Sequence, residues 1–211
     1  MSSSVPSRSL GKSPKVSVVM SVFNAEAYLK DAIQSVLDQT FKDFEFIIIN
    51  DGSTDKSLGI IQDFALHDPR ILIIDQDNTG LTVALRVGCE AAQGQYIARM
   101  DADDLSLPAR FEKQVALLDN NPALVAATGD VEHFDDAGKV LSIARLREDP
   151  RLIRFYNSFA NHLGGHGQVM FQRAAYEEAG GYDTGYSTAQ DYDLWSRLLL
   201  LGDFGNVPEV I

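Results

Sequence analysis

The sequence predicts an α/β fold: a Rossmann-like, mostly parallel sheet flanked by helices, with a smaller α+β portion at the C-terminal end. Two observations predict it. Up to about residue 120, short apolar runs typical of strands alternate with segments whose apolar residues recur every three or four positions. Beyond residue 120, a hairpin-type turn and two glycine-rich stretches replace this alternation.

The strands expected in the first half contain few polar residues, which is typical of parallel strands covered on both faces. These strands are expected at residues 16–22, 44–50, 71–75 and 96–100. The helices are expected at residues 25–39, from the turn at 51–55 to about 66, at about 81–92, and after Pro108. Asn24 is the expected N-cap of the first helix.

The second half is expected to add α+β material to the same sheet. Strands are expected at 124–134, 140–146 and 168–171, and helices at 149–159 and 189–201. We therefore divide the chain into a disordered Ser-rich tail at 1–15, an α/β half that binds the ligand at 16–120, and an α+β half of the same domain at 121–211.

Composition excludes several classes of protein. A formal charge of −12 over 211 residues disfavours nucleic acid as a partner. The longest apolar runs fall far short of the roughly 20 residues of a membrane helix, so no integral membrane segment is expected. The single cysteine, Cys89, cannot form an internal disulfide, which fits a reducing compartment. We expect a cytoplasmic location, with peripheral attachment at the inner face of the membrane left open.

Polar residues follow each of the four strands expected in the first half. Ligands of open parallel sheets bind outside the carboxyl ends of the strands. Function is therefore expected at residues 21–24, at Asp51, and at residues 76–80 and 101–104.

The strongest single feature is Asp101-Ala102-Asp103-Asp104, directly after the fourth strand. Carboxylates this close repel one another, and a hard divalent cation such as Mg²⁺ or Mn²⁺ would stabilise them and bridge to substrate phosphates. The alternative is a solvated acidic turn in which Asp104 or Ser106 caps the next helix.

Three further positions leave a structural and a functional interpretation open. A structural turn explains residues 52–55, whereas Asp51 at the end of an apolar strand could accept a hydrogen bond from a base or a ribose. At the last helix, Asp193 complements the helix dipole, and Asp191 suits a general base only if it faces the acidic cluster. His166, in a glycine loop, could contact phosphate or metal, or serve the structure alone.

Taken together, these segments resemble the family 2 glycosyltransferases of the GT-A fold, over about residues 16–211. Five segments carry the resemblance in the order and spacing of the family: residues 16–24 (VSVVMSVFN), 50–55 (NDGSTD), 96–104 (YIARMDADD), 108–111 (PARF) and 190–195 (QDYDLW).

The resemblance implies transfer of a sugar from a nucleoside diphosphate sugar, most commonly a UDP-sugar, to an acceptor hydroxyl, with inversion at the anomeric carbon. The acceptor is unknown, and synthesis of a polysaccharide or a cell-surface glycan is the expected setting. By the same resemblance, Ser21, Phe23 and Asp51 would hold the base, with Asp51 accepting from its ring N–H. Gly80 and His166 would contact the rest of the nucleotide sugar.

The resemblance also implies a divalent cation, Mn²⁺ or Mg²⁺. Asp103 would ligate it, Asp101 would lie at the metal or the ribose, and Asp191 would deprotonate the acceptor. Relatives continue beyond the position of Ile211 into acceptor-binding or membrane-associated segments, so we expect the second half to be truncated relative to them.

Two other functions remain as alternatives. A sugar-1-phosphate nucleotidyltransferase would carry a glycine-rich, basic loop after its first strand, and residues 22–26 contain none. A nucleotide-sugar-binding module without transferase activity, or a phospho-acceptor receiver, would be favoured if Asp191 lay far from the acidic cluster.

Overall fold

A computed structural model describes residues 13–163 and 165–211. Most of the tail expected at 1–15 lies outside the described residues. In that part of the chain, eight strands form one sheet: β1 (Val16–Val22), β2 (Phe44–Asp51), β3 (Ile71–Gln76), β4 (Tyr96–Met100), β5 (Leu124–Phe134), β6 (Val140–Ala144), β7 (Met170–Gln172) and β8 (Asp203–Val210). The helices are α1 (Leu29–Leu37), α2 (Ser57–His67), α3 (Leu81–Ala91), α4 (Arg110–Asn120), α5 (Pro150–Asn157), α6 (Arg173–Glu178) and α7 (Gln190–Leu201).

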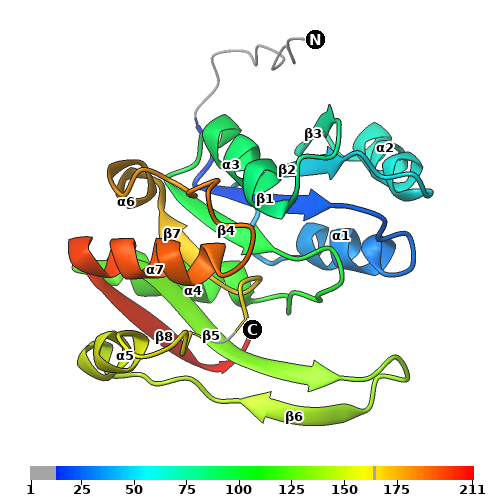
Figure 1. Cartoon of the computed structure of the whole chain (residues 1–211). Coiled ribbons are helices and arrows are strands. Elements are labelled where there is room, and N and C mark those ends of the chain that lie inside the picture. Colours follow the sequence, from blue (N-terminus) through cyan, green and yellow to red (C-terminus); the bar gives the residue numbers. More distant parts are fainter. Residues whose placement is uncertain (1–12, 164) are drawn as a thin grey trace.

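The strand order is β3-β2-β1-β4-β7-β5-β6, with β8 paired to β5 (Figure 1). β1 to β4 run parallel, β7 is antiparallel to both β4 and β5, and β8 is parallel to β5. This confirms the α/β fold with a mostly parallel sheet flanked by helices that the sequence predicted.

Both faces of the sheet are covered, which explains why its strands are apolar at successive positions. In β1, Val19 packs in the core that contains α3, whereas Val18 and Met20 pack in the core that contains α1 and α4. Side chains alternate between the faces of a strand, so a strand with helices on both sides needs apolar residues throughout.

The second half extends the same sheet. The β5–β6 hairpin forms the lower rim of the molecule in Figure 1, and α5 lies beside β8. The predictions omitted α6 and β8. β8 contains few apolar residues, so the apolar pattern of a buried strand is missing from its sequence. Side-chain hydrogen bonds join it to β5: Thr128 Oγ1 donates to Asn206 Oδ1 (3.0 Å), and Asn206 Nδ2 donates to Asp130 (3.2 Å).

The expected N-cap of the first helix is wrong. α1 begins only at Leu29, with Tyr28 at its N-cap position. Asn24 has a left-handed backbone (φ 51°), and its Oδ1 accepts from the backbone N–H of Thr54 (2.8 Å). A side chain that holds a neighbouring loop in this way is not available to cap a helix.

Candidate active site at the strand exits

A pocket of about 480 Å³ lies at the carboxyl ends of the parallel strands; we call it the strand-exit pocket. All four strand exits of the first half contribute to it, as expected for a doubly covered parallel sheet. Its lining residues are Ser21, Phe23, Asn24, Ala25, Tyr28, Asp51, Asn78, Gly80, Leu81, Asp101, Ala102 and Asp103.

The structure therefore brings together most of the site residues singled out in the sequence. The members found in this pocket are Ser21, Phe23, Asp51, Gly80, Asp101 and Asp103. His166 and Asp191, which belong to the second half of the chain, do not line it. The roles assigned to all eight residues stay predictions.

Asp51 holds the turn that enters α3. The residue is 2% exposed, and its Oδ1 accepts from Gln76 Nε2 (2.7 Å) and from the backbone N–H of Thr79 (2.9 Å). Its Oδ2 accepts from the Gly80 N–H (2.9 Å). A carboxylate has about four acceptor positions, so Oδ2 keeps capacity for one further donor in the pocket.

The loop after Asp51 is tied to the exit of β1. Asn24 donates its N–H to Ser53 Oγ (3.1 Å), and Glu26 donates its N–H to Asp55 (3.0 Å). Gly52 has a φ of +71°, and a Cβ there would lie 2.5 Å from the backbone nitrogen of Asn78. Residues 52–55 do not line the pocket themselves but hold the exit of β1 beside it, in agreement with the structural interpretation of this turn.

The acidic cluster is partly neutralised from within the protein. Asp101 forms an ion pair with Arg99, whose side chain is 2% exposed in β4. Burial raises the pKa of Asp104, and the nearby charges of Asp101 and Asp103 raise it further. Asp103 is exposed at the pocket. The alternative helix cap is wrong for both candidates, because Ala109 is the N-cap of α4.

A divalent cation fits this donor set if the substrate supplies part of its coordination. Among the described residues, no three His, Cys, Asp or Glu side chains are arranged to hold a metal ion. Asp101 and Asp103 nevertheless offer carboxylate oxygens to the same pocket. Mg²⁺ is commonly held by one or two carboxylates together with waters and substrate phosphates, so two acids suffice.

The loop that carries His166 lies against the acids. A Cβ at Gly167 would lie 2.4 Å from Asp104 Oδ2 and 2.8 Å from Asp101 Oδ2. His166 itself turns to the other side: its Nε2 is 2.6 Å from the Tyr182 hydroxyl, and its ring contacts Trp195 edge-on. Burial, with a contribution from Arg99, lowers the pKa of His166 well below 6.5, so its ring is neutral at pH 7.

Asp191 begins α7 and is held by its neighbours. Asn161 Nδ2 donates to its Oδ2 (2.8 Å), and its Oδ1 accepts from the Tyr192 N–H (2.8 Å). The Tyr192 hydroxyl donates to the carbonyl of Asn157 (2.8 Å), which ties α7 to the end of α5. Trp195, one turn along α7, is the contact that links this helix to His166.

Comparison with known proteins identifies the family. Residues 17–180 match the family described as Glycosyl transferase family 2. The chain belongs to glycosyl transferase family 2. It is 33% identical over 211 residues to an uncharacterized glycosyltransferase of Haemophilus influenzae, covering 94% of this chain and 64% of that protein. It is 32% identical over 206 residues to the amylovoran biosynthesis glycosyltransferase AmsE of Erwinia amylovora, covering 92% and 74%.

Solved structures share the fold of this chain. S. aureus TarS 1–349 in complex with UDP superposes with a TM-score of 0.76 at 16% identity, covering 92% of this chain and 58% of that one. The mannosyltransferase PcManGT from Pyrobaculum calidifontis, in complex with GDP-Man and Mn²⁺, gives a TM-score of 0.70 at 20% identity, covering 94% and 56%. These likenesses confirm the predicted GT-A fold. The chain of this family 2 member spans about 60% of those two structures.

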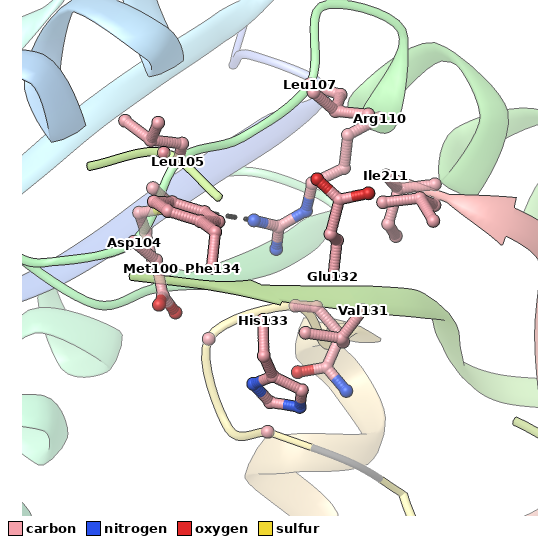
Figure 2. Close-up of a pocket in the computed structure, with 15 residues that line it drawn as sticks. Met100, Asp104, Leu105, Leu107, Arg110, Val131, Glu132, His133, Phe134 and Ile211 are labelled. Atoms are coloured by element: carbon pink, nitrogen blue, oxygen red, sulfur yellow. Dashed lines mark hydrogen bonds between the residues drawn. The ribbon is translucent and has the colours of Figure 1, made fainter. Parts of the chain in front are cut away.

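A second pocket of about 460 Å³ adjoins the acidic cluster of this family 2 chain, under the β5–β6 hairpin. Figure 2 shows Arg110 extending into it toward Met100 and Phe134. Arg110 is 2% exposed, its Nη2 donates to the Arg99 carbonyl (2.7 Å), and burial lowers its pKa to about 10. Asp104 and Gly167 also line this pocket. Asp104 directly follows Asp103 of the strand-exit pocket, so the two pockets adjoin at the acidic cluster.

Sequence reasoning missed two arginines that shape the acidic cluster. Arg99 lies within the quoted segment at 96–104 and Arg110 within the segment at 108–111, yet neither was assigned a role. For Arg99 the available signal was a cation inside an otherwise apolar strand, because a buried arginine needs a nearby carboxylate or carbonyl. Arg110, the first residue of α4, offered no such signal. Asn78, which donates to the Asp51 carbonyl (2.9 Å), was covered only by the expectation for residues 76–80.

Proposed function

We propose that this protein is a metal-dependent, inverting glycosyltransferase that moves a sugar from a nucleoside diphosphate sugar, with UDP-sugar the first choice, to an acceptor hydroxyl. The observation that carries the proposal is the strand-exit pocket at the ends of four parallel strands. It combines an exposed aromatic ring, a buried carboxylate that can accept hydrogen bonds, and two further acids. The similarity to the amylovoran biosynthesis glycosyltransferase AmsE fits a role in polysaccharide synthesis.

The donor base is proposed to bind between Phe23 and Asp51. Phe23 is 53% exposed and lines the pocket, so its ring can stack on a base. Asp51 Oδ2 can accept a ring N–H, because within residues 13–163 and 165–211 its one donor is the Gly80 N–H, which leaves a lone pair for the base. Ser21 and Gly80 complete the wall on either side.

The diphosphate is proposed to lie at Asp103 and Asp101, which would hold the divalent cation. When bound, the cation would neutralise the charge that builds on the departing diphosphate. Arg99 pairs with Asp101 and limits the electrostatic repulsion between the carboxylates of the cluster. His166 is neutral at pH 7, so the contact proposed for it with the donor is a hydrogen bond and not a charge interaction.

Asp191 is proposed as the general base for the acceptor hydroxyl. It does not line the strand-exit pocket, but its partner Asn161 belongs to the segment between α5 and β7, whose Gly167 lies against Asp101 and Asp104. Asn161 and the Tyr192 N–H fix its carboxylate, which orients it toward a single direction of proton transfer. The acceptor is proposed to approach from the side of the second pocket, which is lined by Asp104 of the acidic cluster and by Gly167.

The location of the protein is proposed as peripheral at the inner face of the membrane. In residues 13–163 and 165–211, no helix is both long and apolar enough to cross a bilayer. Attachment would therefore rely on the surface of the described part of the chain or on segments outside it.

A thermal-shift screen with nucleoside diphosphates and nucleotide sugars tests the proposal. With Mn²⁺ and a ligand at about 100 times its dissociation constant, the native state gains about 2.7 kcal/mol, a rise of roughly 5–10 °C in Tm. Asp103→Ala should abolish the Mn²⁺-dependent part of UDP binding in calorimetry, and Asp63→Ala, an exposed acid of α2, should not. Unchanged Mn²⁺-dependent UDP affinity in Asp103→Ala would remove the metal role from the proposal.

A further inference from the structure

Helix α5 is apolar on its outer side as well as on its inner side. Ile153 and Asn157, one turn apart, are buried against the protein. On the outer side, Leu152, Phe155 and Phe159 are 43%, 55% and 73% exposed. Leu152 and Phe155 are three residues apart and share one face of α5. Phe159 lies two residues beyond the end of the helix, and its ring contacts that of Phe155, with centroids 5.2 Å apart. The inner residues already dock the helix, so folding does not account for this outer stripe.

Cations surround the stripe in a chain that is otherwise strongly acidic. The formal charge of the protein is −12, yet four arginines fall within ten residues here. The cations free to face outward are Arg145, Arg147 and Arg151, and the nearby acids are Glu148 and Asp149. Arg154 instead turns to the end of α7, where it donates to the Gly202 carbonyl and pairs with Asp203. Arg151 pairs with Asp149, but its side chain remains 89% exposed, so the pair is at the surface and weak.

Two of the arginines, Arg147 and Arg151, adjoin the rings, and Arg145 is exposed two residues before Arg147. The Arg147 guanidinium lies 3.6 Å from the centroid of the Tyr156 ring, and Tyr156 contacts Phe155. Arg151 and Phe155 are four residues apart on α5, so they also share its outer face. We call this the α5 surface: Arg145, Arg147, Arg151, Leu152, Phe155 and Phe159.

We infer that the α5 surface binds the headgroup region of a lipid bilayer that carries anionic lipids. A helix with arginines beside exposed phenylalanine and leucine is typical of segments that lie in the membrane interface. Anionic headgroups attract cations near the surface, and the rings enter the boundary between headgroups and acyl chains. The acidic remainder of the chain is repelled, so the local charge of the α5 surface decides which face turns to the bilayer.

This docking would orient the candidate site, and here the inference rests on the proposed function. Asn157 and Asn161, at the end of α5 and just beyond it, bond to Tyr192 and Asp191 of α7. A bilayer at the α5 surface would therefore lie on the side of Asp191, the proposed base, and away from α2 at the far end of the sheet (Figure 1). The acceptor hydroxyl would then be presented at the membrane surface.

Co-sedimentation with vesicles tests the inference. The full chain should bind vesicles of phosphatidylcholine mixed with phosphatidylglycerol, bind pure phosphatidylcholine far less, and lose binding as salt is raised. Phe155→Ser with Phe159→Ser should lower the partition coefficient about tenfold or more. Arg145→Gln with Arg151→Gln should lower it about fivefold for each arginine, and only on the anionic vesicles.

Matched control variants lie on other elements. Leu66→Ser removes an 81% exposed leucine of α2, and Lys30→Gln with Lys42→Gln removes two exposed cations near α1 and β2. Both controls should bind vesicles as the wild type does. All the substituted side chains are exposed, so each variant should keep the wild-type Tm.

Three outcomes would overturn the inference. The first is failure of the wild type to bind anionic vesicles, and the second is binding of the α5 variants as tight as that of the wild type. The third is loss of self-association, measured by sedimentation, in the Phe155 and Phe159 variant. Mn²⁺-dependent UDP affinity is measured in the same variants. If it is retained while vesicle binding is lost or absent, the result bears on the α5 surface alone and leaves the proposed transferase function standing.

Discussion

The two halves of the molecule position their candidate site residues in different ways. In residues 16–120, each residue stands at the exit of a parallel strand, and the strand order alone brings the exits together in one pocket. In residues 121–211, His166 and Asp191 stand in a glycine loop and at a helix start, each held by side chains from other elements. The first half thus builds its site from backbone topology, and the second from side-chain contacts.

This difference predicts a division of labour. Variants in the first half should change the affinity for the donor. Variants in the second half should leave that affinity unchanged and lower the rate of transfer.

Asp191→Asn should reduce transfer about 10²–10⁴-fold, because an amide cannot take the acceptor proton. Release of nucleoside diphosphate from the donor found in the thermal-shift screen measures the rate. Donor affinity in calorimetry should be unchanged, since Asp191 does not line the strand-exit pocket. Transfer at the wild-type rate would rule out Asp191 as the base and end the division of labour in its present form.

Gly52→Ala should destabilise the protein by about 2–4 kcal/mol and weaken UDP binding. The left-handed φ of +71° strains any other residue, and the new methyl would meet the Asn78 nitrogen at 2.5 Å. Gly59→Ala is the matched control, since a Cβ at this α2 position meets nothing within 4 Å. That change should stabilise by up to about 1 kcal/mol in urea unfolding. Equal effects at the two glycines would contradict the role of the turn.

Asp51→Ala should cost about 1–3 kcal/mol of stability, because the Gln76, Thr79 and Gly80 donors lose their acceptor. UDP affinity should fall with it, whereas the rate of transfer from saturating donor should change much less. Asp75→Ala, at the end of the neighbouring strand, serves as the comparison. A variant that folds less stably but binds UDP as tightly as the wild type would reduce Asp51 to a structural residue.

The smallest effect concerns the pH dependence of stability. The pKa of His166 is lowered in the folded state, so below pH 6.5 the unfolded chain takes up a proton that the native state does not. Stability should therefore fall from pH 7 toward the folded pKa, and His166→Gln should make this fall less steep. Urea unfolding at several pH values measures it, with exposed His67→Gln as control. An identical pH profile in wild type and His166→Gln would show that the ring is not buried neutral.

Much of the first half could be predicted because its information is local. β1 and β4 begin and end at the expected residues, since continuous apolar runs between polar turns mark buried strands clearly. Six of the residues that line the strand-exit pocket were predicted, because they stand at these strand ends and ligands of parallel sheets bind there. Asn24 was misassigned because its partner, Thr54, lies 30 residues away.

What the residues alone determined is the alternation of strands and helices, the acidic cluster after the fourth strand, and the family. Only the tertiary structure decided that Arg99 neutralises Asp101, that His166 turns toward Tyr182, and that Asp191 stands outside the strand-exit pocket. The physical reason is range: strand and turn preferences act between neighbours in the chain, whereas ion pairing and burial act between groups that meet only after the sheet has formed.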